Sequence, residues 1–427
     1  MIKKYKTYKD SGVEWIGKIP IDWTLVKLKF LMEIKSGKSI STELLSDEYD
    51  IPVLGGNGIL GKTNNYNSES KDIIIGRVGA HCGNIHLLNG KKWVTDNALL
   101  VKSKINEEFL TYWLKSLKLN RLANTNAQPL LTGSLIKNQF ITIPTDSQVF
   151  TQIANYLDYK TNLIDSIIAQ KEELIEKLKE QRQAIINEAV TKGLNPNVPL
   201  RAYGIEWLGD IPEHWKVVKF RYKFETSKGL TITKANLVDE GIPVVNYGEI
   251  HSKFGFEVNP EIHNLKCVIE DYIESNESSL LSKGDFVFAD TSEDIEGSGN
   301  FTHLNSDIPT FAGYHTIIAR LIDNSDYRYF AYFFDSTTYR TQIQNLVKGV
   351  KVYSITNKIL KDTILFYPPV DEQKNISEYI DFKVNKIFSS IEKLEKSIKK
   401  LKEYRQSIIS EAVTGKIDVR DWKPKTA

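Results

Sequence analysis

Residues Gly56–Thr63 match the G-x-x-x-x-G-K-[ST] pattern of a phosphate-binding loop letter for letter. Such a loop must open a helix, because amides at the helix N-terminus hold the anion while the lysine contacts the phosphates. The next residues, 64–68, read Asn-Asn-Tyr-Asn-Ser, which is a poor helix start. Phe286–Asp290 is similar to a magnesium-holding strand, but its repeat counterpart Ile73–Arg77 ends in arginine. An NTPase using Gly56–Thr63 is therefore an alternative and not the favoured function.

Other catalytic patterns are also weak. Methyl transfer to adenine in DNA needs an Asn/Asp-Pro-Pro-aromatic motif, and Tyr367–Val370 has the two prolines with the wrong flanks. Glu-x-Lys sequences occur freely in charged helices, so spacing alone neither indicates nor excludes a nuclease. His81 lies near Cys82 and His86, which is too small a group for a zinc site. We therefore expect no metal and no cofactor on this chain.

Polar loops offer a different chemistry, the recognition of DNA. Amide and cationic side chains are the donors that base edges and phosphates accept, with Asn and Gln suited to adenine and Arg and Lys to guanine. In the first half the candidates are Asn57, Lys62, Asn64, Asn65, Arg77 and His81, followed by Gln128, Thr132, Ser134 and Lys137. In the second half they are Lys348, Lys351, Tyr353, Ser354, Thr356 and Lys358. Each alone could be an ordinary loop residue, but together they favour a DNA-binding surface.

Composition limits where such a surface can be. Lys plus Arg number 56 and Asp plus Glu 54, a net charge of +2, so any nucleic-acid surface must be a local patch. Cys82 and Cys267 are the only cysteines, too few for a disulfide framework, which favours a reducing cytoplasm. The basic start of the chain lacks a following apolar run, and no stretch approaches the ~20 apolar residues of a membrane span. We expect a cytoplasmic protein without a membrane partner.

The elements that would position these loops come in two copies. Gly12–Gly17 returns as Gly204–Gly209, a shift of 192 residues, and Arg182–Thr191 returns as Arg405–Thr414, a shift of 223. Between these ends, Phe109–Ser116 matches Tyr329–Ser336 with a shift of 220. The growing shift places insertions in the second half, and insertions collect in surface loops. The halves should share a scaffold, related by a pseudo-two-fold axis, and differ in the loops they display.

Two long helices are predicted, over 151–191 and 373–414, each preceded by a proline and a capping aspartate, Asp146 and Asp371. Apolar residues recur along both at alternating spacings of four and three, which is a coiled-coil repeat. The first seam contains Leu157, Ile164, Ile168, Ile175, Leu178 and Ile185, and the second contains Ile380, Ile387, Ile391, Leu394, Ile398, Leu401 and Ile408. Packed antiparallel, helices of ~35 residues would be ~50 Å long and could hold two DNA readers up to ~15 base pairs apart.

The regions between the repeated segments Gly12–Gly17 and Gly204–Gly209 and the long helices, of roughly 120–155 residues each, predict two α+β units. Short β-rich runs include 51–54, 72–75, 98–101 and 140–143 in the first unit, and 243–245, 286–289, 316–319 and 363–366 in the second. One amphipathic helix is predicted near 107–118. The fold class is therefore α+β, with two similar domains joined by two long antiparallel coiled-coil helices.

The whole chain resembles the specificity subunit of type I restriction–modification systems. The resemblance rests on Gly-x-Glu-Trp-x-Gly-x-x-Pro-x-x-Trp at 12–23 and its copy at 204–215, and on Pro-…-Gln-x-x-Ile-x-x-Tyr-Leu/Ile-Asp at 144–158 and 369–381. The Arg-Gln-x-Ile-Ile-x-Glu-Ala-Val-Thr helix ends complete it. It implies target-recognition domains over 1–145 and 195–370, a central spacer helix over 146–194, and a distal spacer helix and tail over 371–427.

The same resemblance implies the partners. Each target-recognition domain would read one half of a split sequence in double-stranded DNA, and the helices would set the gap. Two methyltransferase subunits and the motor/endonuclease subunits would dock on this non-catalytic chain and carry S-adenosylmethionine, ATP and Mg. Alternatives that stay open are the recognition subunit of a related restriction enzyme that cuts near its site, and a helical scaffold without DNA selectivity.

Overall fold

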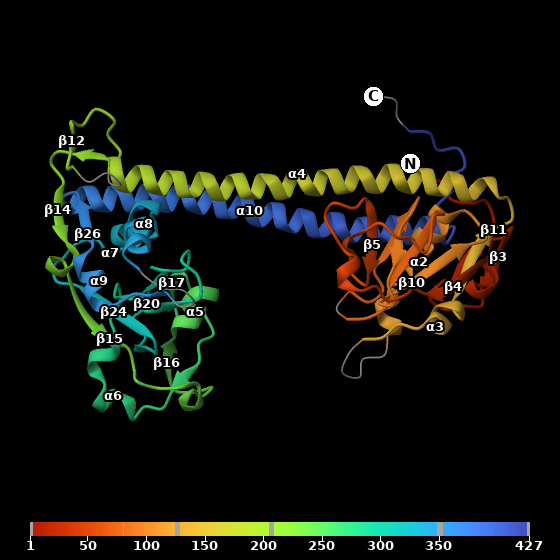
Figure 1. Ribbon diagram of the computed structural model, residues 1–427. Coiled ribbons are helices and arrows are strands. Elements are labelled where there is room, and N and C mark those ends of the chain that lie inside the picture. The colour runs from red at the N-terminus through yellow and green to blue at the C-terminus, as the bar shows by residue number, and fades with distance from the viewer. Residues whose placement is uncertain (1–2, 80, 124–128, 205–208, 348–352, 425–427) are drawn as a thin grey trace. The chain divides into compact units, whose positions relative to one another are not determined.

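The computed structural model describes residues 3–79, 81–123, 129–204, 209–347 and 353–424. The chain divides into two compact units (Figure 1). Unit 1 comprises Met1–Glu172 and Leu394–Ala427, and unit 2 comprises Glu173–Lys393. Each unit therefore contains a globular part and a share of both long helices. None of the described helices combines the length and the apolar character needed to cross a membrane.

The two long helices are α4 (Gln148–Lys192) and α10 (Val370–Val413), each starting three residues before its predicted limit. Asp146 caps α4 as predicted, because its Oδ1 accepts from the Gln148 amide at 2.9 Å. The prediction for Asp371 was wrong. It lies inside the first turn of α10, where its charge still suits the positive end of the helix dipole.

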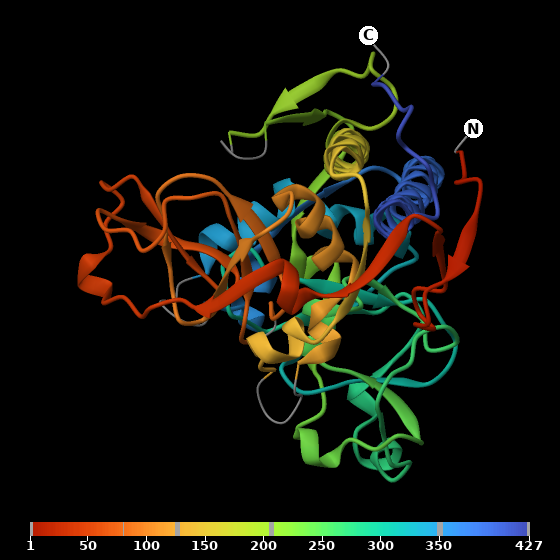
Figure 2. The same ribbon diagram turned by 90° about the vertical axis from the view of Figure 1, so that its right-hand side faces the viewer.

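Antiparallel pairing of the helices is visible within unit 1. Arg405 of α10 bonds to Asp165 of α4 at 2.8 Å, and Lys402 lies 3.5 Å from Glu172. The residue numbers of the paired positions fall along α10 as they rise along α4, so these segments run in opposite directions. Figure 2 shows the two helices end-on and side by side. In unit 2 the guanidinium of Arg182 lies over the ring of Phe388, 5.7 Å from its centre.

The predicted seam residues face inward to different degrees. Leu157, Ile164, Ile168, Ile175, Ile380, Ile387, Ile398 and Ile408 are buried, whereas Leu178, Ile185, Ile391, Leu394 and Leu401 are half-buried. Ile186 and Ile409, which were not in the predicted seams, are fully buried in the cores of unit 2 and unit 1. A straight helix has 3.6 residues per turn, so its apolar face drifts from a seven-residue repeat toward the adjoining globular core.

Unit 1 is built on a four-stranded antiparallel sheet with the strand order β4-β10-β7-β8. Their bounds are Met32–Ser36, Ala98–Ser103, Asp72–Gly76 and Ile85–Leu88. A second sheet, β6-β5-β9, contains Gly58–Thr63, Ile51–Gly55 and Trp93–Val94. The smaller pairs are β1 (Tyr8–Asp10) with β2 (Lys18–Pro20) and β3 (Trp23–Lys27) with β11 (Phe140–Pro144). The short helices are α1 (Leu28–Leu31), α2 (Glu107–Ser116) and α3 (Gly133–Lys137).

Unit 2 has a larger version of this scaffold. Its main sheet has the order β15-β24-β20-β22-β17, with bounds Phe224–Lys228, Thr316–Leu321, Phe286–Ala289, Phe301–Leu304 and Phe256–Val258. The second sheet, β18-β16-β23-β19, contains Cys267–Val268, Ile242–Val245, Thr310–Ala312 and Leu280–Leu281. Smaller pairs join β12 (Leu200–Ala202) to β13 (Asp210–Pro212), β14 (Lys216–Lys219) to β26 (Ile364–Tyr367), and β21 (Thr291–Ser292) to β25 (Tyr353–Ser354). The short helices are α5 (Tyr247–Ser252), α6 (Tyr272–Ser275), α7 (Tyr327–Asp335), α8 (Thr337–Leu346) and α9 (Asn357–Asp362).

The predicted α+β duplication is therefore confirmed. In both units a short amphipathic helix, α2 or α7, is buried against the main sheet and begins at a side-chain cap, Asn106 or Asp326. The largest insertion lies between β16 and β20 of unit 2, where α5, β17, β18 and α6 have no counterpart among the elements of unit 1. This agrees with the sequence, in which the repeat shift is 191 residues between Ile51 and Ile242 and 213 residues between Asp72 and Asp285.

One hydrogen bond recurs between each short helix and its long helix. Tyr112 donates to Asp158 at 2.6 Å in unit 1, and Tyr332 donates to Asp381 at 2.5 Å in unit 2. These are the aspartates that end the repeated Tyr-Leu/Ile-Asp motif. The motif therefore contributes an attachment between globular part and helix in each unit.

The side chain of His303, on β22, is shielded from solvent in unit 2. Its side chain is fully buried, its Nδ1 donates to the Phe256 carbonyl at 2.6 Å, and its Nε2 accepts from Arg328 at 3.3 Å. Burial, and then the charge of Arg328, lowers the pKa of His303 below its usual 6.5. At pH 5.5 the imidazole is therefore still neutral in the folded unit, whereas it would be largely protonated in the unfolded chain.

This arrangement predicts acid sensitivity. Because the folded-state pKa is the lower one, the stabilisation is present above pH 6.5 and is lost as the pH falls below it. We expect His303 to cost unit 2 about 1.4 kcal/mol of unfolding free energy by pH 5.5. Urea unfolding between pH 7.5 and 5.5 measures this, with His303→Gln flattening the dependence and His81→Gln, at an exposed position, leaving it intact. An equal pH dependence in the His303 variant would contradict the assignment.

Candidate nucleic-acid interface

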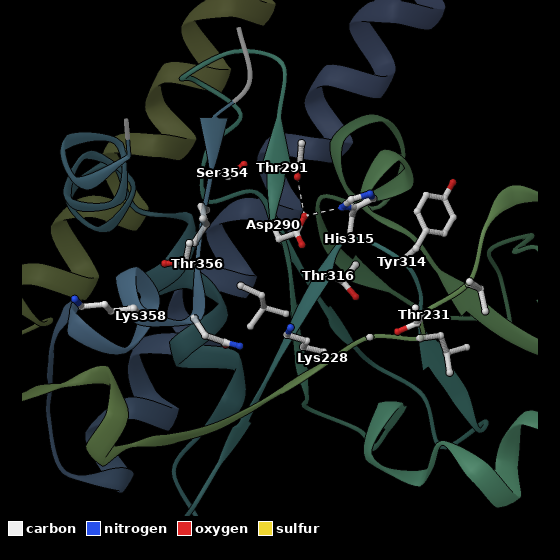
Figure 3. A pocket seen from close by; sticks show the side chains of 16 residues that line it. Lys228, Thr231, Asp290, Thr291, Tyr314, His315, Thr316, Ser354, Thr356 and Lys358 are labelled. Atoms are coloured by element: carbon white, nitrogen blue, oxygen red, sulfur yellow. Dashed lines mark hydrogen bonds and ion pairs between the residues drawn. The ribbon is translucent and has the colours of Figure 1, made fainter. Parts of the chain in front are cut away.

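An open pocket of about 760 Å³ lies at one corner of the main sheet of unit 2 (Figure 3). Four segments meet there, each at the end of a strand or the start of a helix. They are 228–232 after β15, 290–291 after β20, 314–317 leading into β24, and 354–358 leading into α9. Three of the predicted DNA-binding residues, Ser354, Thr356 and Lys358, belong to this lining.

The backbone of the corner is held by hydrogen bonds between these segments. The amide of Asp290 donates to the His315 carbonyl at 3.0 Å, and the amide of Ile355 donates to the Asp290 carbonyl at 2.8 Å. Gly229 donates to the Thr316 carbonyl at 3.2 Å. A Cβ at Gly229 would lie 2.0 Å from the Gly313 carbonyl oxygen, so only glycine permits this close approach.

The lining displays donors and acceptors of mixed charge. Asp290 Oδ1 accepts from Thr291 Oγ1 at 2.8 Å and lies 3.3 Å from His315 Nδ1. His315 has a φ of 57°, a left-handed backbone conformation uncommon outside glycine. Among the described residues, the ammonium groups of Lys228 and Lys358 make no hydrogen bond or ion pair, and the buried Oδ1 of Asn357 has no hydrogen-bond partner. The two lysines are exposed, so their ammonium groups are available to an incoming polar ligand.

A corresponding corner lies in unit 1 and contains several predicted residues. Arg77 follows β7, and its carbonyl accepts from the Leu131 amide at 2.9 Å. Thr132 caps α3, and its hydroxyl lies 3.0 Å from that of Ser134. Arg77 Nη1 donates to Ser36 Oγ at 3.2 Å, while its Nε is buried without a partner. Lys137 ends α3 and is half-buried.

The other predicted residues are distributed more widely. Asn57 is exposed at the turn between β5 and β6. This turn lies beside the corner: a Cβ on the adjacent Gly56 would be 3.3 Å from the carbonyl oxygens of Asn97 and Val78. Lys62 lies on β6, and Asn64 and Asn65 follow it, all exposed. His81 is exposed in the turn before β8. In unit 2, Tyr353 is half-buried on β25. Gln128, Lys348 and Lys351 lie outside the described residues.

The phosphate-loop alternative is wrong. Gly58–Thr63 is strand β6, paired antiparallel with β5, and no helix follows it. Thr63, which would have to reach a metal ion, is fully buried. The lysine side chain of such a strand has no ring of helix amides beside it to hold a phosphate.

Sequence reasoning missed the residues that complete the pocket of unit 2. Lys228, Thr231, Asp290, Tyr314 and His315 lie at strand ends that are far apart in the sequence and meet only once the sheet has formed. The one available signal was Gly229, which aligns with Gly37 of the first half at the shift of 192.

The described residues offer little to catalysis. No group of three or more His, Cys, Asp or Glu side chains among them is placed to hold a metal ion. Burial raises the pKa of the Cys82 and Cys267 thiols, which disfavours the nucleophilic thiolate. What the two corners offer is hydrogen-bond donors and acceptors on rigid backbone, and such groups recognise base edges and phosphates. Fold and site together describe a duplicated chain with a candidate DNA-binding corner in each unit.

The chain belongs to the family of type I restriction modification DNA specificity domains, whose model matches residues 20–177 and again 212–400. It is 23% identical over 424 residues to the type I restriction enzyme MjaVIII specificity subunit of Methanocaldococcus jannaschii, covering 95% of each chain. It is 28% identical over 172 residues to the EcoprrI specificity subunit of Escherichia coli, covering 39% of this chain and 42% of that one.

Solved structures show the same fold. A chain from a structure on complex assembly and conformational transition of the type I R-M system aligns with a TM-score of 0.70 and 15% identity, over 94% of this chain and all of that one. The family assigns DNA-target recognition without catalysis, so the predicted non-catalytic specificity subunit, which binds DNA and methyltransferase, is confirmed at that level. The family carries no catalytic cofactor of its own.

Proposed function

We propose that this chain selects a DNA target in two parts, one read by the globular part of each unit, and brings the catalytic subunits of its complex to that target. The observation that carries the proposal is the recurrence of one backbone corner in both units with different side chains around it. Equal scaffolds with unequal polar surfaces suit two different half-sites.

The long helices complete the proposal as spacers. We assign residues 1–145 and 195–370 to the two readers, 146–194 to the central spacer helix, and 371–427 to the distal spacer helix and tail. The buried and half-buried apolar seams support this, because packed helices fix a distance better than a flexible linker does. The spacing between half-sites would then follow from helix length.

Catalysis belongs to the partners. Two methyltransferase subunits would supply S-adenosylmethionine chemistry, and motor/endonuclease subunits would supply ATP- and Mg-dependent translocation and cleavage. The assembly acts on DNA, and we place it in the cytoplasm. The non-catalytic character of the family supports this division of labour.

The test is target selection by the complete methyltransferase complex. With a pool of randomised duplexes, we expect methylation of a split motif with a fixed gap. Replacing residues 20–145 by the equivalent region of a relative with another target should change one half-site and leave the other and the gap unchanged. Replacing residues 216–367 is the matched exchange and should change only the second half-site. Selection of one continuous motif, or a change in both half-sites after one exchange, would refute the two-reader function.

A further inference from the structure

The corners of the two units match residue by residue. In unit 1 the amides of Gly37, Arg77 and Leu131 donate to the carbonyls of Ala98, Asn97 and Arg77. In unit 2 the amides of Gly229, Asp290 and Ile355 donate to the carbonyls of Thr316, His315 and Asp290. The repeat shifts of 192, 213, 218 and 224 residues convert the first set into the second. The match extends to Thr132 and Thr356, which cap α3 and α9.

This alignment identifies positions that have the same place in the backbone of each corner but carry different side chains. Four such pairs surround the corner: Ser36 and Lys228, Arg77 and Asp290, Asn97 and His315, Ser134 and Lys358. Each pair exchanges a neutral group for a charged or titratable one, or a cation for an anion. The neighbouring pair Lys137 and Lys361 keeps the same residue in both units and is half-buried in both.

Arg77 is the member whose chemistry is most specific. Among the described residues no carboxylate lies within ion-pair distance of its guanidinium, and its one described side-chain hydrogen bond is that from Nη1 to Ser36 at 3.2 Å. The chain has 54 acidic residues, and most other half-buried arginines, such as Arg182 and Arg328, have found one. A held, unpaired guanidinium presents a planar fork of donors, which fits the O6 and N7 acceptors of guanine.

We propose that the four matched pairs are the base-selecting positions of the two readers, and that Arg77 binds the O6 and N7 edge of a guanine in the half-site of unit 1. The inference rests on the proposed two-reader function and adds the residues and one base to it. Asp290 cannot donate to guanine O6 or N7, since an ionised carboxylate only accepts hydrogen bonds. This position of unit 2 therefore does not select guanine in the way that Arg77 does. Lys137 and Lys361, which are the same residue type in both units, contact phosphate in both halves.

The experiment uses the complete methyltransferase complex and a pool of randomised duplexes, with three variants of this chain. Arg77→Lys keeps the charge but loses the fork, so preference for guanine at one position should fall about tenfold or more. Arg77→Gln should turn that preference toward adenine, because glutamine pairs bidentately with adenine. The half-site of unit 2 should not change. Lys137→Ala, the matched control, should weaken binding of all sequences alike and lower the salt dependence.

The results distinguish the assignment of Arg77 from the two-reader function on which that assignment rests. If wild-type complex selects a split target but the Arg77 variants keep the guanine preference, or lose affinity for all sequences equally, the assignment of Arg77 is overturned and the two-reader function stands. If wild-type complex selects no split target, the function itself fails. Thermal unfolding of each variant shows whether a loss of selection comes from a loss of folding, and Arg77→Lys, which retains the side-chain length and charge, should unfold like the wild type.

Discussion

Replacing Lys92 by methionine is expected to lower the free energy of unfolding of unit 1 by about 3–5 kcal/mol. Lys92 Nζ lies 3.0 Å from Asp72 Oδ2, and both side chains are only 1% exposed. The ammonium also donates to the Gly90 carbonyl at 2.9 Å. Methionine has a similar volume but leaves the Asp72 carboxylate without its counter-charge in a dry site, and an uncompensated buried charge is strongly destabilising. Urea unfolding, with hydrogen exchange of peptides from each unit, measures the loss and its location.

Two controls make the Lys92 result specific. In Lys92→Met/Asp72→Leu the charge is gone, so most of the stability should return. Lys266→Met breaks the exposed Lys266–Asp239 pair, whose side chains are 56% and 86% exposed, and should leave the free energy of unfolding almost unchanged. A single variant as stable as wild type would show that the pair contributes little to folding.

The Asp72 carboxylate also carries a pH dependence. Burial alone would raise its pKa, but hydrogen bonds from Ser68, Lys92 and Ser70 outweigh burial and hold the pKa below its ordinary 3.8. A lowered folded-state pKa means that the stabilisation is present above pH 3.8 and is lost as the pH falls toward the folded-state value. This loss lies below the range in which His303 acts, so the two effects can be separated by pH.

The elements were predictable where periodicity decides them. The apolar repeats of α4 and α10 and the β-rich runs that became β5, β7, β10, β20 and β24 follow from side-chain spacing alone. Gly56–Thr63 shows the limit of matching letters. Its residues satisfy a phosphate-loop pattern, yet pairing of β6 with β5 determines what the backbone does. Tertiary pairing overrides a local pattern when the flanking residues do not support the helix that the pattern requires.

The candidate site was only partly predictable, for a related reason. The sequence analysis searched for loops rich in polar residues, and this criterion selected Arg77, Thr132, Ser134 and Lys358. It could not find Lys228 or His315, because these single polar residues at strand ends meet Asp290 only after β15, β20 and β24 have paired. The same criterion selected Lys62, which lies on hairpin strand β6, and Asn64 and Asn65, which follow that strand; the corner does not include it. Aligning the halves by backbone hydrogen bonds separates the two groups.

The duplicated attachment between short and long helix is also unequal, and this inequality gives a matched comparison. In unit 1 Asp158 accepts from Tyr112. In unit 2 Asp381 accepts from Tyr332 and in addition from Arg328, at 2.8 Å from Nη2 and 3.1 Å from Nε. Burial alone would lower the pKa of the Arg328 guanidinium, but its hydrogen bonds to Asp381 outweigh burial and raise that pKa above its usual value. The carboxylate at 381 therefore supports a larger network than that at 158.

Asp381→Asn is accordingly expected to lower the unfolding free energy of unit 2 by about 2–4 kcal/mol, because it weakens hydrogen bonds to a charged partner in a half-buried site. Asp158→Asn should lower that of unit 1 by about 1 kcal/mol, since it alters a bond to a neutral hydroxyl. Tyr332→Phe removes the shared bond alone and should match Asp158→Asn. Hydrogen exchange of peptides from α7 and α2 during urea unfolding locates each effect. Equal losses at 381 and 158 would mean that the bonds from Arg328 to Asp381 add nothing measurable to this attachment.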